Sequence, residues 1–219
     1  MKDNIIRGNN TLSHWDDKHK NEYGEISIPY EEVYTKLGYG AWENLVQADQ
    51  GCSIRIIKEN NEAIRRKSYL NIGCAHGTMD WYLKERIIPE WEMTALDFSG
   101  LVIEANKKRY SKINWEVRDV LLTPIEKDYG LITCLQTIEH FAEGDNYKFL
   151  DNTLEHCEYL ILATVDTKDN CFGEHISHYT IDTFEEKGYD VKWKAKLQEI
   201  QMPDGIYNYI IFLIKGKLN

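Results

Sequence analysis

One stretch, residues 68–83, constrains the fold of this chain more than any other. Its first five residues, SYLNI, have the composition of a short buried strand, and the letters WYL at its end begin an apolar pattern with helical spacing. Between them, Gly73 and Gly77 permit backbone conformations that side chains oppose. A strand, a tight turn and a helix N-terminus favour a nucleotide or anion site, because backbone N–H groups and the helix dipole face a ligand there.

The glycine spacing indicates which nucleotide the turn favours. A dinucleotide fingerprint, G-x-G-x-x-G, needs its third glycine at position 78, which holds Thr78. The spacing present, Gly73-x-Ala75-x-Gly77, resembles the first motif of the class I S-adenosylmethionine (SAM) methyltransferases, an acid followed by x-G-x-G-x-G. Asn71 stands at the acid position of that motif, and Ala75 replaces its middle glycine. A glycine turn alone is equally consistent with any strand-turn-helix corner, so the assignment depends on the residues that follow.

Composition narrows the class of protein and of partner. The 219 residues suit one α/β core, and the net charge of −10 repels polyanions, so we expect a small-molecule acceptor and no nucleic acid. The five cysteines match no zinc or disulfide spacing and are expected to be free thiols. No apolar run reaches the roughly 18 residues of a membrane span, and no signal-peptide pattern is present, so we expect a cytoplasmic protein without membrane contact. The sequence indicates no oligomeric state.

The first 50 residues differ from the rest, because six aromatic residues are scattered among polar ones. We interpret residues 1–50 as short helices that cap the main sheet, and residues 51–219 as the SAM-binding domain. The run WDDKH at residues 15–19 resembles a tryptophan-aspartate entry of small-molecule methyltransferases that folds over cofactor and substrate. An aromatic anchor for this arm is the alternative.

After the glycine turn, strand and helix patterns alternate in the way that builds a parallel sheet. Strands are expected at residues 92–96, 114–117, 129–135 and 159–165, and helices at 51–66, 100–110, 144–156 and 181–187. The chain then closes on strands 191–197 and 207–215, joined by a turn that contains Pro203-Asp204-Gly205. The resemblance implies a Rossmann-like, seven-stranded, mostly parallel α/β sheet of order 3-2-1-4-5-7-6, with the last strand antiparallel and helices on its flanks.

Two acids follow neighbouring strands and fit a nucleoside ligand. Asp97 ends the second strand about 20 positions beyond Gly77, near the distance at which dinucleotide folds place a ribose acid, and Asp119 follows the third strand. A helix cap or a turn is the alternative role of each. The resemblance places ribose on Asp97 and adenine between Phe98, Asp119 and the backbone of Val120. With SAM as cofactor, it implies a binding set of Asn71, Gly73, Cys74, Gly77, Asp97, Phe98, Asp119, Val120 and Gln136.

The letters QTIEHF at residues 136–141 resemble the fourth motif of the family, where the end of a strand faces the transferred methyl group. A later histidine, His175, precedes Thr180 with a spacing that also resembles the family. Methyl transfer to a hydroxyl needs alignment and a base, and His140 and His175 are the base candidates, with Glu139 orienting one of them. A helix cap and a loop brace are the alternative roles of Glu139 and His140.

These expectations converge on a SAM-dependent O-methyltransferase of a small polar acceptor, with a sugar or a nucleotide-linked sugar favoured by family analogy. A divalent metal on Glu139, His140 and His175 is a less favoured alternative, because carboxylate and imidazole suit such ions. That arrangement resembles the metal-dependent methyltransferases of small-RNA 3′ ends, whose pattern E-x-x-E-H has Gln136 at its first position here. A catalytically silent SAM-binding partner protein is the third alternative.

Overall fold

The structure is a computed structural model that describes residues 48–166, 175–197, 200–202 and 205–218. The expected cap, with its WDDKH run, lies almost wholly outside the described residues, because only residues 48–50 of it are described.

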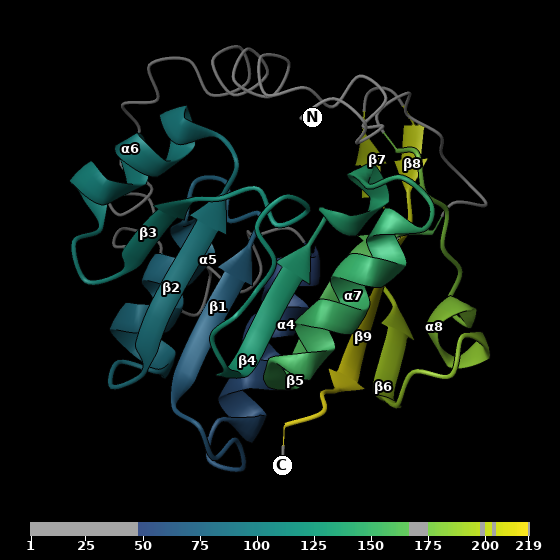
Figure 1. The fold of residues 1–219 in the computed structure, drawn as a ribbon, viewed down its shortest axis with the longest axis horizontal. Helices are drawn as coiled ribbons and strands as arrows, with labels where there is room; N and C mark the ends of the chain where they lie inside the picture. The colour runs from purple at the N-terminus through teal and green to yellow at the C-terminus, as the bar shows by residue number, and fades with distance from the viewer. Residues whose placement is uncertain (1–47, 167–174, 198–199, 203–204, 219) are drawn as a thin grey trace.

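A seven-stranded sheet forms the centre of the molecule (Figure 1). Its spatial order is β3 (Asn114–Val117), β2 (Glu92–Asp97), β1 (Ser68–Ile72), β4 (Tyr129–Leu135), β5 (Cys157–Val165), β9 (Tyr209–Lys215) and β6 (Val191–Lys196). The first five are mutually parallel, and β9 runs antiparallel to both of its neighbours. Because β9 is the seventh strand of this sheet along the chain, the predicted order 3-2-1-4-5-7-6 is confirmed.

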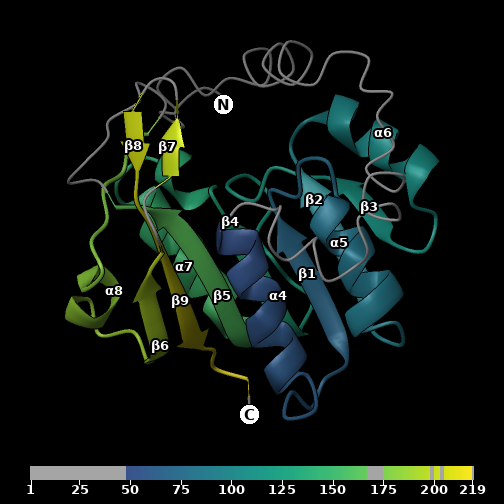
Figure 2. The ribbon, with the colours of Figure 1, turned by 180° about the vertical axis from the view of Figure 1, so that it is seen from behind.

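Helices cover both faces of this sheet (Figures 1 and 2). They are α4 (Ala48–Asn60), α5 (Thr78–Tyr82), which continues as the π-helix η1 (Leu83–Ile87), α6 (Gly100–Arg109), the 3-10 turn η2 (Ile138–His140), α7 (Asp145–Glu155) and α8 (Thr183–Glu186). Ile54 of α4 and Met79 of α5 belong to one buried apolar cluster, whereas Phe149 of α7 and Phe184 of α8 belong to another. The sheet therefore separates two cores.

The central strands are buried on both faces, as strands between two helical layers must be. In β4, Leu131 enters the core with α4 and α5, and the next residue, Ile132, enters the core with α7. Both side chains are at most 1% exposed, and burial of each contributes about 1.5–3 kcal/mol to folding. These two cores fix the carboxyl ends of β1, β2 and β4 at a common edge of the sheet.

Some element bounds differ from the sequence predictions. The helix predicted at 51–66 is described from Ala48 and ends at Asn60, because the carbonyls of Asn61 and Ile64 turn toward the Lys67 ammonium at 2.6 Å each. The helix predicted at 181–187 is the shorter α8. A small ladder of β7 (Ile200–Met202) and β8 (Gly205–Tyr207) occupies the region predicted as a turn.

Within the described part of the chain, no helix has the length and apolar character needed to cross a membrane. The four described cysteines, Cys52, Cys74, Cys134 and Cys157, are free thiols, as predicted for them.

Candidate active site

The glycine turn between β1 and α5 needs both of its glycines for steric reasons. Gly73 has a φ of +74°, and a Cβ there would lie 2.2 Å from Oγ1 of Thr137. Gly77 has a φ of +65°, and a Cβ there would lie 2.2 Å from the ring of Trp115. Between them, Ala75 adopts a φ of +44°, which is unfavourable for an L-residue. The turn is therefore pressed closely against its neighbours.

The backbone N–H groups of this turn are used within the protein. Gly73 and Cys74 both donate to the carbonyl of Leu96, at 2.9 and 3.0 Å, and Gly77 donates to the carbonyl of Cys74 at 2.9 Å. Ala75 donates to Oδ2 of Asp97 at 3.1 Å. The bonds from Gly73, Cys74 and Ala75 fasten the turn to the end of β2, and the bond from Gly77 closes the turn on itself.

Asp97 is the polar group that this arrangement places at the end of β2. It is 6% exposed, and besides Ala75 it accepts a hydrogen bond from the backbone N–H of Ser99 at 2.9 Å. An ionised carboxylate has about four acceptor positions. The residue lines a pocket together with its neighbours Leu96 and Phe98. This position fits a carboxylate that accepts hydroxyl hydrogen bonds.

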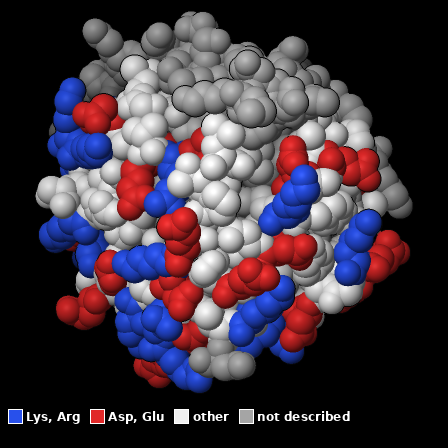
Figure 3. All heavy atoms as spheres, viewed as in Figure 1, with Lys and Arg blue, Asp and Glu red and all other residues white. Residues whose placement is uncertain are grey.

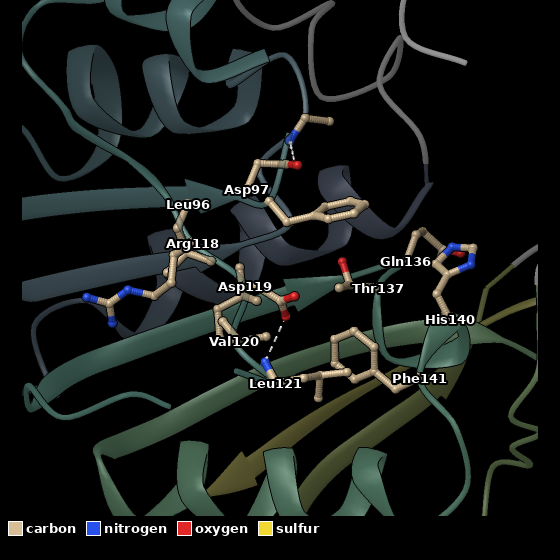
Figure 4. A pocket seen from close by; sticks show the side chains of 14 residues that line it. Leu96, Asp97, Arg118, Asp119, Val120, Leu121, Gln136, Thr137, His140 and Phe141 are labelled. Carbon is tan, nitrogen blue, oxygen red and sulfur yellow. Dashed lines mark hydrogen bonds between the residues drawn. The ribbon is translucent and has the colours of Figure 1, made fainter. Parts of the chain in front are cut away.

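The pocket opens beyond the carboxyl ends of β1, β2 and β4 (Figure 4). Six residues of the predicted cofactor set line it, namely Gly73, Asp97, Phe98, Asp119, Val120 and Gln136. Of the predicted catalytic residues, His140 lines it as well. The remaining lining residues were not assigned a binding role from the sequence: Ile72, Ala75, Leu96, Arg118, Leu121, Thr137 and Phe141. The lining combines two acids, apolar side chains and an imidazole, which is the kind of mixture that small-molecule sites have.

Asp119 closes a turn at the border of the pocket. Its Oδ1 accepts from the N–H of Leu121 at 3.1 Å, and its carbonyl accepts from Thr123 at 2.8 Å, so it closes a turn. Figure 4 shows the same carboxylate bordering the pocket. The neighbouring Arg118 extends away from the pocket centre in this view and pairs with Glu116 at 3.2 Å. The pocket wall at β3 is therefore held by local bonds.

Three predicted cofactor residues do not line the pocket. The side chain of Asn71 is 4% exposed and bonds to Asp80 and Thr133 in the core. Cys74 is buried, and burial raises the pKa of its thiol well above the ordinary value. Gly77 abuts Trp115. Asn71 precedes the turn, and Cys74 and Gly77 belong to it; all three contact the core side of the turn.

Gln136 connects the pocket to a residue that sequence reasoning missed. It follows β4 with a φ of +51°, and the strand ends at Leu135, as predicted. Its Nε2 donates to Oδ2 of Asp49 in the first turn of α4, at 3.3 Å. Asp49 is fully buried, and burial raises its pKa. No local pattern around Asp49 marks it, because its partner is far away in sequence.

Glu139 is a buried carboxylate whose two oxygens have different surroundings. It is 0% exposed, and its Oε2 accepts from the hydroxyl of Thr164 at 3.0 Å. Among the described residues, its Oε1 has no hydrogen-bond partner. Burial is the main reason why its pKa rises to about 8. A carboxylate kept this far from water usually serves a ligand, a cation or a proton transfer.

His140 and His175 meet beside this carboxylate. Their ring centroids lie 5.0 Å apart, edge to face. The segment that carries His175 is fixed to η2, because the N–H groups of Ile176 and Ser177 donate to the carbonyl of Glu139 at 2.9 and 3.1 Å. Side-chain ligand atoms of Glu139, His140 and His175 all lie within 4.8 Å of one another, a spacing that one divalent ion can bridge. The structure thus brings together all three residues predicted for catalysis.

Comparisons with known proteins agree with this geometry. A family model described as "Methyltransferase domain" matches residues 70–158, which span the glycine turn, Asp97, Asp119 and the Glu139-His140 pair. No curated protein sequence matches the chain.

Solved structures with this fold include several methyltransferases. Magnesium protoporphyrin IX methyltransferase (ChlM) from Synechocystis PCC 6803, with bound SAM, superposes with a TM-score of 0.60 at 11% identity, over 94% of this chain and 93% of that chain. The N-methyltransferase NodS from Bradyrhizobium japonicum WM9 gives 0.57 at 17%, over 75% and 93%. The methyltransferase domain of bacterial CtHen1-CN gives 0.56 at 21%, over 76% and 96%. These likenesses establish a shared fold.

Proposed function

We propose that this chain is a class I SAM-dependent methyltransferase and that it methylates an oxygen of a small polar acceptor. The observation that carries the proposal is the position of His140. It lines the pocket that contains Asp97 and also touches His175 beside the buried Glu139 carboxylate. Oxygen acceptors need a base or a Lewis acid, and this group offers both kinds of chemistry.

Cofactor binding is proposed for the half of the pocket at β2 and β3. Asp97 accepts hydrogen bonds from the ribose hydroxyls, and Asp119 accepts one from the adenine amine. Apolar contact with the ring comes from Phe98 and Val120, both of which line this part of the pocket. SAM supplies a methyl group on a positively charged sulfur, so its leaving group is already activated. The protein therefore needs mainly to align acceptor and methyl group.

Proton removal is proposed for the half of the pocket at β4. The imidazole of His140 takes the proton of the acceptor hydroxyl, and His175 packs against it and holds the ring in place. In its ionised form, Glu139 stabilises the positive charge that develops on the imidazole, and its pKa of about 8 makes this form more abundant as the pH rises through that value.

Ion binding at the same three side chains is the second candidate, and the 4.8 Å grouping of their ligand atoms favours it. One carboxylate and two imidazoles suit Mn²⁺, Fe²⁺ or Zn²⁺. A bound divalent ion would lower the pKa of the acceptor hydroxyl, so no separate base would be needed.

A small acceptor fits the charge of the protein better than a polyanion. Figure 3 shows acidic and basic side chains interspersed over the described part of the visible face. The net charge of the whole chain is −10. We favour a sugar or a nucleotide-linked sugar as the acceptor, by analogy with the small-molecule branch of the family. Free thiols at the four described cysteines support the cytoplasm as its compartment.

The burial of α4 supports a proposal for the boundary between the cap and the methyltransferase domain. Ile54 and Ile57 of this helix are fully buried in the core, and Asp49 bonds to Gln136. We therefore propose that the methyltransferase domain includes α4 from Ala48 onward, and that the cap comprises the residues before it.

Screening tests the proposal directly. The purified protein is incubated with SAM and panels of sugars, nucleotide sugars, small alcohols and small RNAs, and release of S-adenosylhomocysteine (SAH) is followed. Turnover on a hydroxyl acceptor supports the proposal. Turnover on RNA alone, with strongly salt-dependent binding, favours the RNA alternative. Tight SAH binding without turnover on any acceptor class favours a silent SAM-binding protein.

A further inference from the structure

A chain of buried hydrogen bonds runs behind the glycine turn. The hydroxyl of Tyr69 lies 2.7 Å from Oγ1 of Thr133, which lies 2.9 Å from Oδ1 of Asn71. Nδ2 of Asn71 lies 2.9 Å from Oδ2 of Asp80. All four side chains are at most 4% exposed. Asn71 and Thr133 are also register partners in β1 and β4. The chain therefore joins the two central strands to α5.

With Asp80 ionised, the hydrogen bonds of this chain run toward its carboxylate. Thr133 has one hydroxyl hydrogen, which it donates to the Asn71 carbonyl oxygen, so Tyr69 donates to Thr133. The amide nitrogen of Asn71 then faces Asp80, which accepts. A flipped amide would place its oxygen against the Asp80 oxygen, which is unfavourable. Asp80 therefore acts as the acceptor that ends the chain.

Asp80 also supplies a carboxylate near position 71, where the first motif has an acid and this chain has an asparagine. The resemblance places an acid on the strand before the glycine turn, where this chain has Asn71. The structure places a fully buried carboxylate 2.9 Å from that amide, carried instead by the first turn of α5. One residue stands before the turn and the other after it, so their bond spans the turn (Figure 2 shows β1 and α5).

We propose that Asp80 is a positioning residue for cofactor binding, which as a carboxylate holds the turn at residues 73–77 in its binding shape through Asn71. The proposal rests on the proposed role of this turn in SAM binding. Burial raises the pKa of Asp80 to about 7, so its charge changes near neutrality. The titratable groups that interact with it, Tyr69 and Cys74, stay neutral there, because burial raises both pKa values well above their ordinary values. SAM carries a net positive charge, so its binding favours the ionised form.

Exchanging the side chains of Asn71 and Asp80 tests whether the two residues act as a pair. In Asn71→Asp two carboxyl groups face each other and cannot both ionise, so we expect SAH affinity to fall by about tenfold at pH 8. In the double variant Asn71→Asp with Asp80→Asn, the new carboxylate accepts from Thr133 and from the new amide at position 80. We expect its affinity to return to within about threefold of wild type. Wild-type affinity in the first variant, or a folded double variant as weak as the first, overturns the proposal.

Charge is tested separately with Asp80→Asn, which keeps an acceptor for Asn71 but does not titrate. The measured quantity is the ratio of SAM affinities of wild type and this variant, because titration of SAM itself cancels in the ratio. We expect the ratio to favour wild type increasingly, by about fivefold in total, from about pH 6 to about pH 8. A ratio that stays constant over this range overturns the proposal.

Controls keep the proposal separate from the proposed function. Circular dichroism and thermal melting establish that each variant is folded, and the single variant Asp80→Asn decides the matter if Asn71→Asp does not fold. If wild type itself binds no SAH, the proposed function fails. If wild type binds, Asp97→Ala does not, and the exchange variants all bind like wild type, the role of Asp80 alone is overturned.

Discussion

The backbone N–H of Ala75 donates to the side chain of Asp97 at 3.1 Å, so the glycine turn and the end of β2 are joined by a direct bond. The two residues belong to different motifs of the sequence, and each lines the same pocket. The position of the Asp97 carboxylate, and with it the binding of any cofactor to Asp97, therefore depends on the conformation of the turn. The geometry of one half of the site depends on the other.

Ala75 offers a test of strain in this turn. Its φ of +44° costs an L-residue about 1–2 kcal/mol, and the extra chain entropy of glycine offsets part of that cost. We expect Ala75→Gly to raise the free energy of unfolding by about 0.5–1 kcal/mol in urea titrations. Gly73→Ala is the matched control, and it should lower that free energy, because its Cβ would collide with Thr137. A destabilised Ala75→Gly variant would contradict the account of strain.

Asp80 makes the stability of the fold depend on pH. Its pKa is about 7 in the folded protein and about 3.8 in the unfolded chain, so the native state holds a proton between these values that the unfolded state has lost. The stabilising contribution is complete below about pH 4 and is lost as pH rises through about 7, by about 4 kcal/mol in total. The melting temperature of wild type should therefore fall across this pH window relative to that of Asp80→Asn. Parallel melting curves at all pH values would refute the assignment.

How much of this could be predicted from the sequence depends on the range of the interactions. The strand at 129–135 and the order of the sheet follow from local apolar patterns and from the order of the motifs, and the structure has both. Asp97 and His140 follow strand ends, so fold geometry alone places them at the pocket.

Other features depend on partners that no local pattern reveals. Asp49 meets Gln136, and Asn71 turns away from the pocket toward Asp80, through tertiary packing of α4 and α5. The described part of α4 includes residues 48–50, before the predicted bound of 51, and Ile54 and Ile57 bury this helix in the core.

The histidines are expected to affect turnover and not cofactor affinity. His140→Ala should reduce turnover by about 10²–10⁴-fold once an acceptor is known, and His175→Ala should reduce it to a smaller extent. His178→Ala is a matched control from the same segment, because His178 is exposed. SAH affinity measured by calorimetry should remain within about threefold of wild type in all three variants. Normal turnover in both His140→Ala and His175→Ala would show that these histidines have a structural role and take no part in catalysis.

Treatment with a chelator distinguishes a mechanism that uses His140 as a base from one that uses a bound metal ion. If His140 acts as a base, treatment with EDTA followed by its removal leaves turnover unchanged. If Glu139, His140 and His175 hold an ion, turnover is lost and is restored by one of Mn²⁺, Fe²⁺ or Zn²⁺. Glu139→Gln gives an independent readout, because it would weaken ion binding measured by metal analysis of the purified protein.

Cofactor titration tests the central claim most directly. Calorimetry with SAM or SAH should show one binding site in wild type, a loss of about 10–100-fold in affinity in Asp97→Ala, and a smaller loss in Asp97→Asn. Asp119→Ala should weaken binding less, since it contributes one hydrogen bond to the adenine in this account. No binding to wild type, or equal affinity in wild type and Asp97→Ala, would contradict the assignment of the pocket to SAM.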